Sequence, residues 1–469
     1  NLKLRYIAKM EDIMSIKSIF YSQKEFFNEE ATLPINFRMV NLIKLKKELL
    51  KNENEIYTAL YEDLGKSKED AFISEFSHCL NEINYFIKNL RSLSKPKKVK
   101  TSFINFKSKA YIYKKPYGVC LIISCWNYPL YLSLMPLIGA IASGNTCILK
   151  LHPLSHNTNK LIEKILREIF EKCYIFSTYG DENELNELLD LNFDYIFGTG
   201  NPNFGKLIYE KSSKNLIPIT LELGGKNPCI VHDDCKIDVS CKRIVHGKFL
   251  NSGQTCLAPD IIYINHKIKD EFIRKIIFYI EHFYSEDPLN FKHYSKIINE
   301  PHFMRLIKIL ENHRDNIIFG GESSKEKLKI APTIIDKNEI IPCEIFGPIL
   351  QIKTYDILDD IIYSLKCTPP PLALYLFTTN KTIINRFLNV PFGGGCINDT
   401  IVHVCENNLP FGGLKNSGIG AYHGRYSFDT FTHKKSILIK SVKVDIKSRY
   451  PNSKNYNLKF IKPLFSKNK

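Results

Sequence analysis

The feature that most constrains the fold is a regular alternation between residues 117 and 200. Short apolar runs, which we interpret as buried strands, cover 118–124, 146–150, 174–176 and 193–197. The segments between them have helical spacing and cover 130–143, 156–172 and 182–189. Strands that alternate with helices predict a parallel, doubly wound α/β sheet, because parallel neighbours need a long crossover connection. Such sheets bind dinucleotides at the carboxyl ends of their strands.

The same alternation resumes after residue 225 and indicates a second lobe. The segments with a helical or strand signal in this part are 236–250, 260–264, 269–283, 342–351, 373–378 and 393–398. We therefore expect two doubly wound parallel-sheet lobes joined near residue 220, since 469 residues exceed one ordinary core. Ahead of the first sheet, 36–64 and 69–90 predict helices and 110–113 a strand.

Composition argues against several other classes of protein. The thirteen cysteines include no Cys-x-x-Cys and lie partly in apolar runs, which indicates a reducing compartment without a disulfide framework. Histidines do not fall at ligand spacing with them, so we predict no metal site. Neither a run of about 20 apolar residues nor a secretory signal is visible, so we expect a cytoplasmic protein. The net charge of +16 comes without a nucleic-acid-binding motif, so we predict no nucleic-acid partner.

A cysteine and a glutamate are the best candidates for chemistry. Cys256 ends the segment 249–256 (Phe-Leu-Asn-Ser-Gly-Gln-Thr-Cys), and Glu222 lies in 221–226 (Leu-Glu-Leu-Gly-Gly-Lys). Glycines mark tight turns and places where the backbone passes close to a ligand. A thiol is a strong nucleophile near neutral pH, and a carboxylate can activate water against the covalent intermediate. Taken alone, Glu222 is equally consistent with a structural partner for a lysine.

Other candidates follow strands, at the edge where such a sheet binds ligands. Asn127, in Trp-Asn-Tyr-Pro, either donates an amide N–H to an oxyanion or caps the next helix. Lys150 ends a strand, where it either meets a cofactor ribose or phosphate or is simply solvated. The segment 200–205 (Gly-Asn-Pro-Asn-Phe-Gly) suits phosphate or ribose binding at a helix N-terminus, although it lacks the three-glycine fingerprint. Glu344, in Glu-Ile-Phe-Gly-Pro, is a further carboxylate or part of a capped loop.

In this order and spacing, these motifs resemble those of the aldehyde dehydrogenase superfamily. The resemblance covers about residues 22–465 and is closest to the class 3 branch, which includes the fatty aldehyde dehydrogenases. Further stretches of class 3 type are 247–253, 371–375, 409–413, 421–424 and 427–431. The resemblance implies a variant Rossmann cofactor domain, a catalytic domain and a small β bridging and oligomerisation element.

On this basis we expect three regions. Residues 1–220 form the NAD(P)-binding domain with a bridging arm near 100–116, residues 221–425 the catalytic domain, and residues 426–469 an oligomerisation segment with a basic tail. Class 3 members are dimers, so the resemblance also implies a homodimer. The tail resembles the segment ahead of the membrane anchor in fatty aldehyde members, and it is a candidate for contact with an anionic membrane surface.

The resemblance assigns roles to the catalytic candidates. Cys256 attacks the aldehyde carbon, and the Asn127 side chain with the Cys256 backbone N–H holds the oxyanion of the hemithioacetal. Loss of a hydride to the nicotinamide leaves a thioester. Glu222 then activates the water that hydrolyses this thioester.

The resemblance also assigns the cofactor contacts. Glu344 binds the nicotinamide ribose with Phe346 packed nearby, and Lys150 meets the adenosine ribose or its phosphate. The remaining cofactor contacts are Gly200, Asn201, Phe204, Gly205 and Leu223. The family usually has Lys-Pro-Ser-Glu where this chain has Lys-Leu-His-Pro, so Pro153 replaces a carboxylate that repels a 2′-phosphate. We therefore expect that NAD and NADP are both accepted.

The expected activity is the NAD(P)-dependent oxidation of medium- or long-chain aliphatic aldehydes to carboxylic acids. The alternative is a catalytically inactive structural or binding protein on the same scaffold. Loss of Cys256, Glu222 or Asn127 would mark that alternative, and all three are present. An acylating relative that passes the thioester to coenzyme A usually lacks the glutamate, so Glu222 argues against it.

Overall fold

The apolar runs of the first half of the chain pair into a six-stranded sheet with the order β17-β7-β6-β3-β4-β5. Five of its strands are parallel, and β17 pairs antiparallel with β7. The strands are β3 (Val119–Ile123), β4 (Thr146–Lys150), β5 (Ile175–Thr178), β6 (Tyr195–Thr199), β7 (Ile219–Glu222) and β17 (Gly418–Ile419). The computed structural model describes residues 15–102, 105–445, 450–452, 454, 456–459 and 462.

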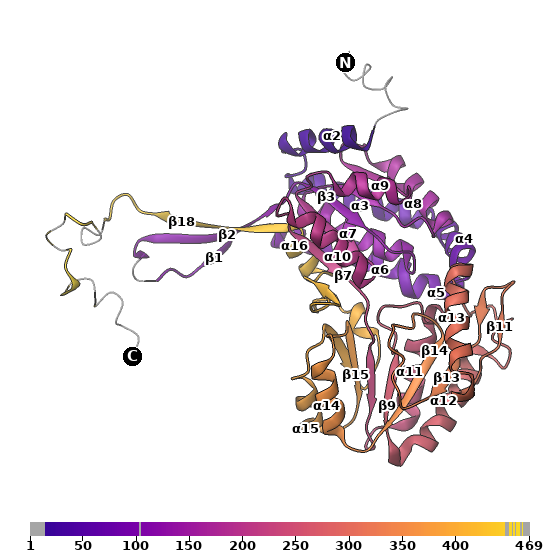
Figure 1. Ribbon diagram of the computed structural model, residues 1–469. Helices are drawn as coiled ribbons and strands as arrows, with labels where there is room; N and C mark the ends of the chain where they lie inside the picture. Colours follow the sequence, from indigo (N-terminus) through magenta and orange to yellow (C-terminus); the bar gives the residue numbers. More distant parts are fainter. Residues whose placement is uncertain are drawn as a thin grey trace.

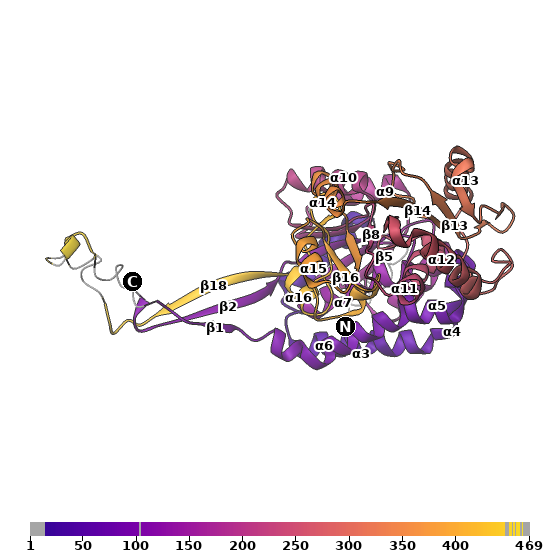
Figure 2. The ribbon, with the colours of Figure 1, turned by 90° about the horizontal axis from the view of Figure 1, so that it is seen from below.

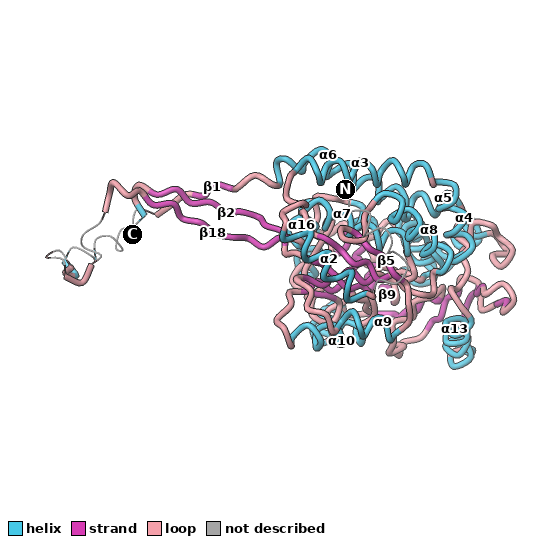
Figure 3. Tube along the Cα trace, turned by 90° about the horizontal axis from the view of Figure 1, so that it is seen from above, coloured by secondary structure: helices cyan, strands magenta, loops and turns pink. Residues whose placement is uncertain are grey.

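Helices cover both faces of this sheet, so its strands carry apolar residues in both directions. On one side Cys120 and Ile122 of β3 pack in the core with α7, and on the other side Val119 and Leu121 pack with α2, α9 and α10. Figure 3 shows these helix layers with the strands between them. The helices are α2 (Ile16–Asn28), α7 (Pro129–Ser143), α8 (His156–Ile169), α9 (Glu182–Leu189) and α10 (Pro202–Ser213).

The second half of the chain forms a seven-stranded sheet with the order β10-β13-β14-β9-β8-β15-β16. Only β10 is antiparallel to its neighbour. The strands are β8 (Pro228–Val231), β9 (Ile261–Asn265), β10 (Ile317–Phe319), β13 (Thr333–Asp336), β14 (Ile349–Tyr355), β15 (Ala373–Phe377) and β16 (Gly394–Ile397). The helices of this part are α11 (Ile237–Phe249), α12 (Lys269–Tyr284), α13 (Glu300–Asn312), α14 (Leu358–Cys367) and α15 (Lys381–Phe387). The expected fold class, two doubly wound α/β lobes with a small β element, is confirmed.

The two long helices expected near the N-terminus are each interrupted. The expected helix 36–64 divides at Asn52 into α3 (Ile35–Lys51) and α4 (Glu53–Leu64), because the Asn52 side chain donates to the Glu48 carbonyl at 2.8 Å and ends α3. The expected helix 69–90 contains a π-helical turn, and its parts are α5 (Lys68–Ala71), η1 (Phe72–Phe76) and α6 (Ser77–Leu93). Hydrophobic periodicity does not register such breaks, since the apolar face continues through them.

A three-stranded antiparallel arm projects from the body, as Figures 1 and 2 show. Its strands are β1 (Lys97–Val99), β2 (Ser108–Pro116) and β18 (Thr432–Lys440), with β2 in the middle. The short helix α16 (Arg425–Thr430) leads from the body into β18. The arm therefore joins two segments that lie more than three hundred positions apart in the sequence.

The expected division into domains stays a prediction, and two elements bear on it. The boundary expected at 220 falls within β7. In addition β17, from the expected catalytic domain, pairs with β7 in the first sheet.

Parts of the basic tail lie outside the described residues, at 446–449, 453, 455, 460–461 and 463–469. Among the described residues, every helix is too short or too polar to cross a bilayer.

Candidate active site

Cys256 follows a tight and strained turn after α11. Within η3 (Leu250–Gly253), Asn251, Ser252 and Gly253 all have left-handed backbone, with φ of 54°, 52° and 70°. Such backbone is costly for residues with a Cβ and persists only where surrounding contacts hold it. The Ser252 hydroxyl donates to the Ser295 carbonyl at 2.5 Å, and a Cβ on Gly253 would overlap a neighbouring carbonyl.

Asn127 reaches this turn from the first sheet. It follows β3, and its Nδ2 donates to the Gln254 carbonyl at 3.0 Å. In return, Asn251 Nδ2 donates to the Asn127 carbonyl at 2.9 Å. The alternative that Asn127 caps α7 is wrong, because Tyr128 is the N-cap residue. One N–H of the Asn127 amide thus holds the turn beneath Cys256, and the other remains for a ligand in the cavity that Asn127 lines.

A buried ion pair fixes the Asn127 loop from below. Lys66 Nζ lies 2.5 Å from Glu75 Oε1, and these side chains are only 1% and 0% exposed. Lys66 also donates to the Asn127 carbonyl at 3.2 Å. Glu75 Oε2 accepts the backbone N–H groups of Leu130 and Tyr131, at 2.9 and 3.1 Å, in the first turn of α7. A carboxylate is favourable at a helix N-terminus, so the pair anchors this loop. Lys66 lies in the turn between α4 and α5, and Glu75 lies in the π-helical turn η1, so each looks like an ordinary charged residue in the sequence.

Glu222 ends β7 and faces the same cavity as Cys256. Its side chain is buried, and neither carboxylate oxygen has a hydrogen-bond partner among the described residues. Burial raises its pKa well above the ordinary value for glutamate. The alternative of a structural ion pair with a lysine is therefore wrong, and the carboxyl group is a strong base when ionised.

Three adjoining cavities meet around these residues. The largest, of about 680 Å³, is lined by most of the expected site residues, namely Asn127, Gly200, Asn201, Glu222, Leu223, Cys256, Glu344 and Phe346. A smaller cavity of about 340 Å³ holds the expected adenosine-side residues Lys150, Pro153, Gly200, Asn201 and Phe204. A third, of about 170 Å³, is mostly apolar and lies on the other side of Cys256. Cys256 therefore lines both the large cavity and this smaller one, which we call the apolar tunnel.

The carboxylate of Glu344 lies in a close-fitting part of the large cavity. A Cβ on Gly224 would overlap this carboxylate, so glycine is required there. Burial, followed by the nearby Asp260, raises the pKa of Glu344 to about 8. Phe346 is left-handed, with φ of 49°, and its ring packs edge-on against Trp126 at 5.5 Å between centroids.

The segment 200–205 forms the turn between β6 and α10. The Asn201 side chain accepts the Phe204 N–H at 3.0 Å and caps α10. A Cβ on Gly200 would overlap the Phe204 ring, and one on Gly205 would lie 2.6 Å from Leu223. The glycines therefore let the helix N-terminus approach the sheet edge closely, which suits a phosphate or ribose.

Lys150 is buried rather than solvated, so the solvated alternative is wrong. Its Nζ donates to the carbonyl groups of Gly180 and Leu151, at 2.5 and 3.2 Å, and lies 3.7 Å from Glu184. Sequence reasoning missed Glu184, because its place in α9 looks like a solvated helix face. Lys150 still lines the adenosine-side cavity.

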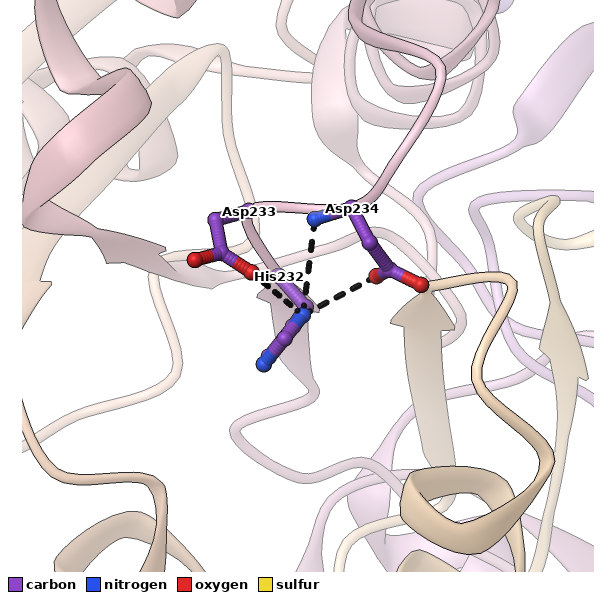
Figure 4. A group of neighbouring side chains, drawn as sticks. All are labelled: His232, Asp233 and Asp234. Atoms are coloured by element: carbon purple, nitrogen blue, oxygen red, sulfur yellow. Dashed lines mark hydrogen bonds and ion pairs between the residues drawn. The ribbon is translucent and has the colours of Figure 1, made fainter.

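A separate cluster of possible metal ligands lies beyond β8. His232, Asp233 and Asp234 each offer one atom within 4.8 Å of the others. Figure 4 shows how the two aspartate side chains flank the His232 ring. Their carboxylates are already engaged, because Asp234 accepts the Thr378 hydroxyl at 2.6 Å and Asp233 pairs with Lys267 at 3.2 Å. We assign no metal to this cluster.

Two doubly wound sheets with a half-buried thiol between an apolar tunnel and a larger cavity are typical of an α/β enzyme. The model of the aldehyde dehydrogenase family matches residues 8–437. The chain is 43% identical to 4,4'-diaponeurosporen-aldehyde dehydrogenase of Staphylococcus aureus, over 96% of this chain and 99% of that protein. It is 40% identical to aldehyde dehydrogenase family 3 member A2 of Rattus norvegicus, over 91% of this chain and 90% of that protein. The substrate-bound structure of Staphylococcus aureus AldH superposes with a TM-score of 0.94 at 41% identity. The superposition covers 97% of this chain and 100% of that chain.

The chain therefore belongs to the aldehyde dehydrogenase family and is an oxidoreductase. The expected resemblance to the class 3 branch is confirmed by the family 3 relative.

Burial, and then the carboxylates of Glu344 and Glu222, raise the pKa of the Cys256 thiol. We therefore expect iodoacetamide to alkylate Cys256 slowly at about pH 7, with a rate that keeps rising beyond about pH 9, because the thiolate is the reactive form. Peptide mass spectrometry over this pH range measures the rate, and the exposed Cys343 controls for reagent activity. A rate that levels off near pH 8 would contradict a raised pKa for the Cys256 thiol.

Proposed function

We propose that the protein oxidises apolar aldehydes of medium or long chain to carboxylic acids with NAD or NADP. The observation that carries this proposal is the place of Cys256, which lines both the apolar tunnel and the large cavity. An aldehyde carbonyl at the inner end of the tunnel would meet the thiol, with its alkyl chain against apolar walls. Those walls include Leu250, Leu257, Ile401 and Val404.

The chemistry on Cys256 follows from groups that face it. The thiolate adds to the aldehyde carbon, and the free N–H of Asn127 is suited to bind the resulting oxyanion. Loss of hydride from the hemithioacetal carbon leaves a thioester on Cys256. Glu222, whose buried carboxylate lacks a partner, is suited to take a proton from the water that attacks this thioester. The raised pKa of Glu222 makes its carboxylate a stronger base for that step.

The cofactor residues fit a nicotinamide dinucleotide. When bound, this cofactor accepts the hydride. Glu344 would hold the nicotinamide ribose, and Gly224 leaves room for its carboxylate. The turn at Gly200 and the N-terminus of α10 would face a phosphate or ribose, and Thr199 adds a buried hydroxyl without a partner among the described residues.

The alternative, a catalytically inactive scaffold, has less support. Cys256, Glu222 and Asn127 all line one cavity, and the Glu222 carboxylate bears an energetic cost that a purely structural site would not need. An acylating enzyme that uses coenzyme A is disfavoured by the same carboxylate. Contact of the basic tail with a membrane surface stays a prediction.

Each buried CH₂ group contributes about 0.8 kcal/mol, so we expect kcat/KM to rise roughly fourfold per carbon from about six carbons until the tunnel is filled. NADH formation across a series of straight-chain aldehydes measures this trend. Cys256→Ser should lose about a thousandfold in turnover. Turnover confined to short or aromatic aldehydes would remove the lipid-like substrate. Turnover of Cys256→Ser close to the wild-type rate would overturn the covalent mechanism.

Pro153 and two acidic residues, Asp181 and Glu182, line the adenosine-side cavity. We expect Pro153→Glu to lower kcat/KM for NADP about tenfold relative to NAD, or ~1.4 kcal/mol, because a carboxylate repels the 2′-phosphate. Glu182→Gln should change the ratio in the opposite direction. Steady-state kinetics with both cofactors measure the ratio. A wild-type protein that already rejects NADP would contradict dual acceptance.

The arm suggests a homodimer. β18 is an edge strand of the arm, and its exposed Ile437, Leu438 and Ile439 would be a liability if left unpaired. We expect Ile437→Lys with Ile439→Lys, which lie on one face of the strand, to convert a dimer to a monomer in sedimentation velocity. Tyr363→Lys, which replaces an exposed aromatic residue of α14, serves as the control. A monomeric wild-type protein would refute the dimer.

A further inference from the structure

Tyr422 is a buried tyrosine at the junction of the apolar tunnel and the large cavity. It lines both, as do Cys256, Leu132 and Phe411. Its side chain is 0% exposed, and its hydroxyl makes no hydrogen bond of ordinary geometry with a described residue. A buried hydroxyl without a partner costs about 1–3 kcal/mol, so its presence at this place needs an explanation.

The other tyrosines that line these two cavities differ in this respect. The Tyr128 hydroxyl lies 2.6 Å from Thr255 Oγ1, and the Tyr131 hydroxyl lies 2.7 Å from His423 Nε2. Each is therefore already engaged within the protein. The Tyr422 hydroxyl has a contact with Tyr131 that lowers the pKa of Tyr422, but it makes no hydrogen bond of ordinary geometry with a described residue. It can therefore still bond a ligand in the cavity.

The position of this hydroxyl is rigid. The Tyr422 ring packs edge-on against Phe197 at 5.0 Å and against Phe411 at 5.7 Å between centroids. Its backbone exchanges hydrogen bonds with Phe411, at 2.8 and 3.1 Å. A group fixed in this way suits the orientation of a small ligand better than a mobile side chain does.

A second unpartnered polar group faces the same cavity. Both carboxylate oxygens of Glu222 lack partners among the described residues. Burial raises the pKa of Tyr422, and the charges of Glu222 and then Cys256 raise it further. A buried water needs two to four polar partners and room for its volume, and the large cavity provides both.

We propose that Tyr422 is a second contact, beside Glu222, of the water that hydrolyses the thioester on Cys256. This inference rests on the proposed function. The Tyr422 hydroxyl hydrogen-bonds the water and fixes its orientation, while Glu222 accepts one of its protons. The water oxygen bonds to the thioester carbon, the carbon–sulfur bond breaks, and Cys256 leaves as a thiolate. The product is the carboxylic acid, and the proton on Glu222 returns to the thiolate or to solvent.

The test is Tyr422→Phe, which removes the hydroxyl and keeps the ring. We expect NADH formation in the first turnover to stay within about twofold of wild type, while steady-state kcat falls about tenfold to a hundredfold. The acyl-enzyme should accumulate, as seen by intact mass spectrometry after quenching. Hydroxylamine, which attacks thioesters without a positioned water, should restore turnover in this variant more than in wild type.

Tyr174→Phe is the matched control. Tyr174 is also buried with an unpartnered hydroxyl, but it packs against Phe26, Phe37 and Phe170, away from the cavities. The Tyr174→Phe variant should leave both the first-turnover rate and the steady-state kcat unchanged. If Tyr422→Phe keeps its steady-state rate, or loses the first turnover in equal measure, Tyr422 does not hold the hydrolytic water.

Glu222→Gln separates this inference from the proposed function. It should form the acyl-enzyme and turn over slowly. If it turns over normally, or if wild type forms no acyl-enzyme, the proposed mechanism itself fails whatever the Tyr422 variant does. If Glu222→Gln accumulates the thioester and Tyr422→Phe behaves as wild type, only the role of Tyr422 is overturned.

Discussion

The site depends above all on the exchange of hydrogen bonds between the Asn127 loop and the turn before Cys256. Each side donates a side-chain amide to a backbone carbonyl of the other, at 3.0 and 2.9 Å. One loop leaves the first sheet and the other follows a helix of the second, so the exchange sets where the two sheets meet. The buried Lys66–Glu75 pair fixes the Asn127 side of this contact. Breaking such a pair typically costs several kcal/mol, which makes the contact rigid.

The site holds several ionisable groups in a dry environment, and this has an energetic cost. Glu222 and Lys248 are buried without partners among the described residues, and burial lowers the pKa of Lys248 to about 8. Burial also raises the pKa of Glu344, to about 8. The apolar cores on either side of each sheet offset the free-energy cost of burying these groups. Their concentration around one thiol is the pattern expected where function, and not stability, selects the residues.

Much of this could be predicted from the sequence, because strands such as 146–150 and helices such as 182–189 have strong local patterns. The partners of Cys256 were found through motifs, since Asn127, Glu222 and Glu344 each lie beside a glycine or a strand end. Lys66, Glu75 and Glu184 were missed, because a charged residue on a helix or in a short turn looks the same whether it is solvated or buried against a distant loop. Tyr422 lies in a class 3 stretch, but its unpartnered hydroxyl depends on tertiary packing that no local pattern contains.

The pairing of β17 with β7 places a late segment of the chain beside Glu222, with Gly418 directly opposite it. During synthesis the ribosome therefore releases the strand that carries Glu222 almost two hundred residues before the strand that covers its edge. Until then β7 is an open edge, able to pair with another nascent chain. The order in which the chain emerges thus makes the backbone of Glu222 one of the last parts of the first sheet to be completed.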